Sequence, residues 1–175
     1  KKRGHKVMVT SNGLFTKPSM VDDILNSAVD TITFSIDSVN GNETVTDGHT
    51  SNKVYENIEA VVKGRKPGTL GVRLQATLHA NCDNDLYDVI RYGARIGCDI
   101  INVGRLDRQF RPNLERPDAQ QERSIFLKAD EIARSCGIQL DWLQYSVSSG
   151  LTRFVYRLLK KKLHRSGQYC LKTFD

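Results

Sequence analysis

Short strand-like runs alternate with longer helix-like runs along most of the chain, and this alternation limits the fold more than any other feature. The strand-like runs are 5–11, 31–37, 70–79 and 98–106, and 138–144 is a candidate fifth strand. The helix-like runs between and after them are 18–28, 51–64, 83–97, 118–137 and 150–167. Repeated alternation of this kind is typical of a parallel sheet with helices packed outside it. The sequence therefore predicts an α/β fold, either a doubly wound sheet or a barrel or partial barrel.

The ends of the helices carry local signals. Ser19 is expected to cap the first helix, and Asp83 or Asn84 the third, because short polar side chains accept hydrogen bonds from the first free amides of a helix. Gly64 and Gly97 are expected to end the helices that they follow.

The strands carry polar side chains on one face. In "TITFSIDSVNG" (31–41), apolar residues alternate with Thr33, Ser35 and Asp37. The run 70–79 repeats this pattern with Arg73, Gln75, Thr77 and His79, and two further runs end in "TSNG" (10–13) and in Asn102 and Arg105. Parallel strands buried on both faces are normally almost continuously apolar. An unsatisfied buried polar group costs about 1–3 kcal/mol, so a polar face inside a barrel needs a polar occupant. We favour a large polar ligand over water at the carboxyl ends of the strands, where ligands bind in both candidate folds.

Composition places the chain among soluble globular proteins. It has 175 residues, of which 26% are charged and 39% hydrophobic. No apolar run approaches the roughly 18 residues of a membrane span, and no signal peptide is recognisable. We therefore expect a cytoplasmic protein without a membrane partner.

The net charge of +6 is concentrated near the end of the chain. Residues 151–175 contain seven basic residues and one acidic residue, and the rest of the chain is neutral. A basic segment can bind nucleic acid or form a solvated helix face. We favour the solvated face, so a nucleic-acid partner is not expected.

The four cysteines lack the spacing of a metal site. Cys82, Cys98, Cys136 and Cys170 all lie more than ten residues apart, which excludes a CxxC zinc motif. Cys98 and Cys136 follow helices and precede strands, where small buried residues are expected.

Four segments, in their order along the chain, resemble a known family. "KVMVTSNG", "ITFSIDSVNG", "VRLQATLHAN" and "CLKTFD" together look like the radical S-adenosylmethionine (SAM) enzymes, in the branch with a C-terminal SPASM extension. The resemblance implies a partial (β/α)6 TIM-like barrel of parallel strands with outer helices, truncated at both ends. Residues 1–149 would form the later strands of the barrel core, and residues 150–175 would form a basic helix and the start of the extension.

The resemblance also implies SAM-binding roles for residues at the strand ends. These residues are Ser11, Asn12, Ser35, Asp37, Gln75, Thr77 and Arg105. Ser35 and Asp37 would bind the ribose hydroxyls or the methionine moiety, and Arg105 would lie at the barrel mouth. From the residues alone, other interpretations stay open. Asp37 could cap a turn, "NG" (12–13) could be a simple turn, and Arg105 could pair with Asp107 or Asp99.

Two departures from the family pattern concern the metal cluster. The CxxxCxxC motif that holds the [4Fe-4S] cluster is absent from the chain, and so is the glycine-rich motif of the second strand. Both would lie upstream of Lys1, so the chain by itself is expected to be inactive. Cys170, in "YCLKTFD", matches the position where the first cysteine of a SPASM extension binds an auxiliary iron–sulfur cluster.

The resemblance thus predicts the core of an enzyme that reductively cleaves SAM at a [4Fe-4S] cluster. The resulting radical would abstract hydrogen from a peptide or small-molecule substrate, and an electron donor would reduce the cluster. The alternatives are a lyase or aldolase barrel, a non-catalytic barrel that binds a polar ligand, and a binding module based on the basic tail. No lysine stands at the end of a strand, which argues against a Schiff-base enzyme.

Overall fold

The computed structural model describes residues 4–15, 17, 19–39, 51–107 and 114–143. All of these residues belong to the first compact unit of the chain, Lys1–Leu143. The predicted helix 150–167, the predicted domain boundary at 149–150 and Cys170 lie outside the described residues.

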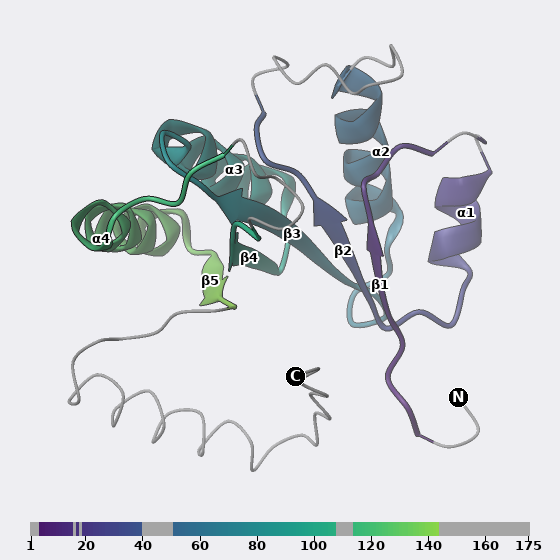
Figure 1. The fold of residues 1–175 in the computed structure, drawn as a ribbon. Helices are drawn as coiled ribbons and strands as arrows, with labels where there is room; N and C mark the ends of the chain where they lie inside the picture. Colours follow the sequence, from purple (N-terminus) through teal and green to yellow (C-terminus); the bar gives the residue numbers. More distant parts are fainter. Residues whose placement is uncertain (1–3, 16, 18, 40–50, 108–113, 144–175) are drawn as a thin grey trace. The chain divides into compact units, whose positions relative to one another are not determined.

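The described sheet has five parallel strands (Figure 1). They are β1 Met8–Ser11, β2 Thr31–Ser35, β3 Gly71–Leu78, β4 Ile100–Arg105 and β5 Gln139–Trp142. Their spatial order is β1-β2-β3-β4-β5, so each strand pairs with the one before it in the sequence. A doubly wound sheet reverses its strand order at a switch point, and this sheet does not. The arrangement is that of a partial TIM-like barrel, which confirms the predicted fold class.

Four helices connect the strands and lie along the outer side of the sheet (Figure 1). They are α1 Met20–Leu25, α2 Ser51–Gly64, α3 Asp83–Ile96 and α4 Ala119–Cys136. Each lies within the run predicted to be helical. No helix in the described ranges is both long enough and apolar enough to cross a bilayer.

The core lies between the helices and one face of the sheet. Alternate strand residues contribute to it, including Phe34, Leu74 and Ile101, whose exposed fractions are all 0%. The helices add Ile58, Val61, Val89, Ile90 and Ala129. Because side chains alternate between the faces of a strand, the polar residues between these apolar ones lie on the opposite face.

The predicted helix cap at Ser19 is right in position only, and the predicted cap of α3 is wrong. Ser19 occupies the N-cap position of α1, but its side chain makes no capping hydrogen bond. Helix α3 is preceded by Cys82 at the N-cap, so neither Asp83 nor Asn84 caps it. The acidic residues of α3 lie inside its first turn instead, where they interact favourably with the positive end of the helix dipole.

Helix α4 has the strongest local signals at both ends. Asp118 accepts hydrogen bonds from the backbone amides of Gln120 and Gln121, each at 2.8 Å, and the Gln121 side chain accepts one from the Asp118 amide. This reciprocal arrangement is a capping box. Gly137 ends the helix with φ 70°, and Gly97 ends α3 in the same left-handed conformation with φ 87°. The predicted stop at Gly97 is therefore confirmed.

Arg65 and Asp99 fasten the amino ends of β3 and β4. The Arg65 guanidinium donates to the Asp99 carboxylate and, at 2.7 Å, to the carbonyl oxygen of Gly97. The second carboxylate oxygen of Asp99 also accepts the Val72 amide at 2.7 Å. This cluster lies at the end of the sheet opposite the barrel mouth. Asp99 therefore pairs with Arg65, and the suggested pair between Asp99 and Arg105 is wrong.

Candidate functional site

Four polar residues lie side by side across the sheet on the face turned away from the helices. The strand register aligns Ser35 with Gln75, Gln75 with Asn102, and Asn102 with Asp141. Aligned residues of parallel strands point to the same face, and neighbouring strands lie about 4.8 Å apart. We call this set, Ser35, Gln75, Asn102 and Asp141, the central polar row.

Burial differs along the central polar row. Ser35 is exposed, Gln75 and Asp141 are half-buried, and Asn102 has an exposed fraction of 5%. The Asn102 Oδ1 atom is buried and has no hydrogen-bond partner in the described part of the chain. Leaving a buried acceptor unsatisfied costs about 1–3 kcal/mol, and most buried polar groups have a partner. The row therefore fits a polar ligand that donates a hydrogen bond.

Asp37 and Thr77 lie beyond the row, toward the carboxyl ends of the strands. Asp37 Oδ1 accepts the Thr77 amide at 2.8 Å, and the Ile36 amide donates to the Gln75 carbonyl at 2.9 Å. The pairing of β2 with β3 thus continues past the end of β2. The second carboxylate oxygen of Asp37 makes no hydrogen bond within the described ranges and remains available at the mouth.

Ser11 and Asn12 form a turn at the end of β1. The Ser11 hydroxyl accepts the Gly13 amide at 3.1 Å, and Asn12 Oδ1 accepts the Leu14 amide at 3.1 Å. Gly13 has φ 76°, and a Cβ atom there would lie 2.9 Å from Val54 Cγ1, so both backbone conformation and space require glycine. The predicted turn at 12–13 is confirmed, while contact of Ser11 and Asn12 with SAM stays a prediction.

Arg105 is directed at helix α4. It is aligned with the buried residue Leu78 and therefore lies on the helix side of the sheet. Its Nε donates to Glu122 Oε1 at 2.6 Å, and its Nη2 donates to Glu122 Oε2 at 2.5 Å. This two-point pair differs from the expected position at the barrel mouth. A role for Arg105 in cofactor binding stays a prediction.

Asp141 is the member of the central polar row that the sequence analysis missed, and Asn102 was noted without a role. The alternation of apolar and polar residues in "IQLDW" (138–142) could have predicted that Asp141 lies on the polar face. Leu140 and Trp142 pack against the core, and Asp141 between them does not. The position of both residues in the row depends on the register between strands, which is a property of the folded sheet.

The described cysteines are poorly suited to hold an iron–sulfur cluster. No group of three or more His, Cys, Asp or Glu side chains that could hold a metal is present among the described residues. Cys82 and Cys98 are buried, and burial raises the pKa of Cys82 to about 11 and that of Cys98 to about 12. Cys98 is buried as predicted. The prediction for Cys136 is wrong, because this residue is exposed at the end of α4.

Alkylation should distinguish these three thiols. At pH 8 we expect iodoacetamide to modify Cys136 at least about tenfold faster than Cys82 or Cys98, because the reactive species is the thiolate and burial disfavours it. Peptide mass spectrometry over time would give the three rates. In guanidinium chloride the rates should become similar. Equal rates in the folded chain would contradict the burial of Cys82 and Cys98.

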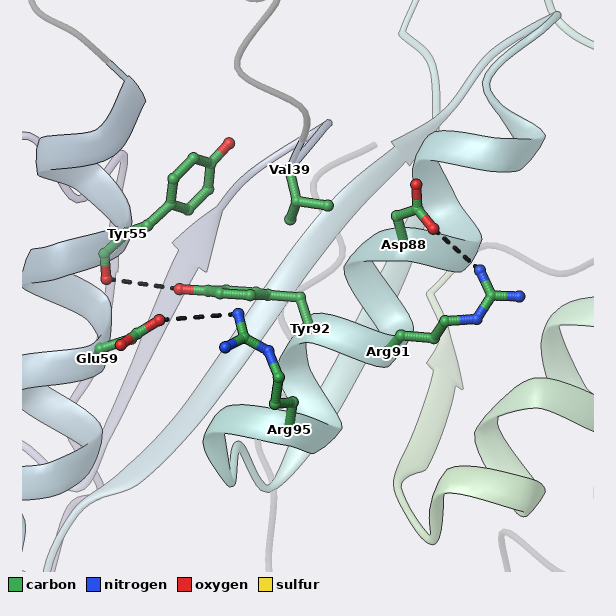
Figure 2. A pocket seen from close by; sticks show the side chains of 7 residues that line it. All are labelled: Val39, Tyr55, Glu59, Asp88, Arg91, Tyr92 and Arg95. Atoms are coloured by element: carbon green, nitrogen blue, oxygen red, sulfur yellow. Dashed lines mark hydrogen bonds and ion pairs between the residues drawn. The ribbon is translucent and has the colours of Figure 1, made fainter.

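A cavity of about 420 Å³ lies in the outer layer, between α2 and α3 (Figure 2). Its charged side chains are paired with one another. Arg91 contacts Asp88 at 2.9 Å, and Arg95 lies 3.9 Å from Glu59 and 5.3 Å from the centre of the Tyr92 ring. These pairs satisfy the charges within the cavity wall. The central polar row, with its unpartnered acceptor, is therefore the stronger candidate site.

Comparison with known proteins shows the fold. No protein-family model and no curated protein matches the chain. It is similar to SuiB of Streptococcus suis in a crystal structure bound to S-adenosylmethionine, with a TM-score of 0.61 and 11% identity over 82% of this chain and 33% of that chain. A second SuiB crystal structure gives a TM-score of 0.61 and 10% identity over 94% of this chain and 37% of that chain. The chain thus spans about a third of SuiB and shares its α/β barrel fold.

Proposed function

We propose that the chain is the SAM-binding barrel core of a radical SAM enzyme of the SPASM branch. The observation that carries this proposal is the part of the central polar row on β2 and β3, Ser35 and Gln75, on the face of the sheet opposite the helices. The proposal is also supported by the fold that the chain shares with SuiB, which has been crystallised with S-adenosylmethionine. Three of the four sequence segments that resemble the radical SAM family coincide with β1, β2 and β3 of this fold, and the fourth, "CLKTFD", lies outside the described residues.

The chemistry of the row and the mouth suits this cofactor. The exposed hydroxyl of Ser35 and the half-buried amide of Gln75 can both donate and accept hydrogen bonds. The available carboxylate oxygen of Asp37 can accept a hydrogen bond from a ribose hydroxyl. Thr77 is half-buried, and its backbone amide holds Asp37 in place. These four residues would bind and orient SAM.

The proposal locates the cluster ligands in parts of the protein other than the described residues. When bound, a [4Fe-4S] cluster supplies the electron for reductive cleavage of SAM. The role of the present residues would be to orient SAM and exclude water. Cys170 remains a proposed ligand of an auxiliary cluster. The proposed partners are an electron donor and a peptide or small-molecule substrate.

Calorimetric titration would test cofactor binding directly. We expect the chain to bind S-adenosylhomocysteine, a stable relative of SAM, saturably. Gln75→Ala should weaken this binding about tenfold because it removes a half-buried hydrogen-bonding partner. Ser35→Ala should weaken it about threefold because Ser35 is exposed.

Asp88→Asn is the matched control, because Asp88 lies on α3 in the outer layer and pairs with Arg91. It should leave the affinity unchanged. Absence of saturable binding, or an affinity that Gln75→Ala and Ser35→Ala leave unchanged, would contradict the proposal. A different polar ligand bound at the same row would favour the non-catalytic barrel.

A further inference from the structure

Asn102 presents an unsatisfied acceptor in the middle of the candidate site. Its exposed fraction is 5%, and its Oδ1 atom has no hydrogen-bond partner among the described residues. Its register partners Gln75 and Asp141 place it on the face turned away from the helices. A buried carbonyl oxygen that no protein group satisfies requires a donor from a ligand or from ordered water.

Asp141 adds a negative charge beside this acceptor. It is half-buried and lies next to Asn102 on β5. Within the described ranges, no hydrogen bond or ion pair involves its carboxylate. Arg73, the cation on this face of β3, is aligned with Ile100 and lies two strands away from Asp141. The two residues therefore offer a carbonyl oxygen and a carboxylate with no cation paired to them.

Gly104 leaves space on the mouth side of Asn102. It lies two residues beyond Asn102 on the same face of β4. Among the described residues, a Cβ atom at Gly104 would meet only Leu143 Cδ1, at an ordinary contact distance of 3.9 Å. As far as the described residues extend, the strand surface next to Asn102 is therefore open at Gly104.

We propose that Asn102 and Asp141 form a subsite for a cationic group of the substrate, an alkylammonium or a guanidinium. Such groups carry only donors, which matches an acceptor beside a carboxylate, and charge-assisted hydrogen bonds are the strong ones. This inference rests on the proposed function, which assigns SAM to the neighbouring residues of β2 and β3. The substrate class is then a peptide or small molecule with a lysine-like or arginine-like side chain.

SAM carries an ammonium and a sulfonium group of its own, so the test must separate the two sources of positive charge. The chain would first be saturated with S-adenosylhomocysteine. It would then be titrated with N-acetyl-lysine methylamide or with the neutral analogue N-acetyl-norleucine methylamide, followed by amide NMR. We expect saturable shifts at β4 and β5 with the lysine compound and none with the norleucine compound.

Three variants probe the subsite. Asp141→Asn and Asn102→Leu should each weaken binding of the lysine compound about tenfold, and Gly104→Val should block it. Affinity for S-adenosylhomocysteine should change less than about twofold in Asp141→Asn and Asn102→Leu. Asp88→Asn is the matched control for Asp141→Asn, and Gly104→Ala is the control for Gly104→Val. Asn102→Leu should also raise the melting temperature, because it removes an unsatisfied buried acceptor.

The outcomes separate this inference from the proposed function. Binding of the lysine compound that depends on Asp141, without binding of S-adenosylhomocysteine, would support the subsite and contradict the proposed function. Loss of S-adenosylhomocysteine binding in Asp141→Asn would assign the residue to the cofactor site and overturn the inference. Equal binding of the lysine and norleucine compounds, or binding of neither, would also overturn it.

Discussion

Gly93→Val should lower the free energy of unfolding by about 3 kcal/mol, the upper part of the range for overpacked cores. Gly93 is a buried residue of α3 that lies close to side chains of β3 and β4. A Cβ atom there would lie 2.4 Å from Ile101 Cδ1 and 3.0 Å from Leu74 Cδ1. Both of these side chains have an exposed fraction of 0%. Because neither side chain can move into solvent, the added atoms must either force them into other rotamers within the packed core or push α3 away from β3 and β4.

Urea unfolding followed by circular dichroism would measure this loss. Gly93→Ala should show a smaller loss in the same direction, although alanine exceeds glycine in helix propensity by about 1 kcal/mol. Gly104→Ala adds the same methyl group where space is available and should be close to neutral. A stabilising effect of Gly93→Ala would show that propensity outweighs the close approach, and would contradict the packing described for α3.

Glu122→Gln should lower the free energy of unfolding by about 2 kcal/mol. The substitution replaces the Glu122 carboxylate with a neutral amide, which removes the charge that attracts Arg105 and one of the two oxygens that accept its hydrogen bonds. Removing one partner from a fully buried pair costs about 3–5 kcal/mol. The side chains here are 28% exposed for Arg105 and 16% exposed for Glu122, so solvent screening reduces the effect.

The double variant Arg105→Met, Glu122→Leu separates the structural role of Arg105 from the role in SAM binding that the family resemblance implies. It removes both charges together and should recover most of the stability, as apolar replacements of buried pairs often do. If Arg105 acts only between β4 and α4, affinity for S-adenosylhomocysteine should change less than about twofold. A tenfold loss of affinity in the folded double variant would support the role in cofactor binding.

The succession of strands and helices could be read from the sequence because it depends on local patterns. Buried strands need alternate or continuous apolar residues, and glycines such as Gly97 can take the left-handed conformation that ends a helix. The caps were less predictable. Ser19 and Asp83 have the right chemistry, but the way the chain enters a helix decides whether such a side chain can reach the free amides.

Some residues of the candidate site could likewise be predicted from the sequence, and others could not. Ser35, Gln75 and the polar face of β2 and β3 followed from alternation within single strands. The direction of the Arg105 side chain did not follow from this alternation. Arg105 lies an odd number of residues from Asn102 and therefore on the other face, and its contact with Glu122 joins residues 17 positions apart. Helix α4 provides the partner that directs this guanidinium away from the mouth.

The sequence by itself determined the α/β class, the elements and the existence of a polar strand face, because all of these depend on the periodicity of side chains along one segment. Only the tertiary structure selected a sequential, barrel-like strand order, aligned Asn102 with Asp141 and left Asn102 Oδ1 without a donor. The physical reason is that register and burial arise between segments. Many distant contacts together set them, and no local pattern in the chain contains them.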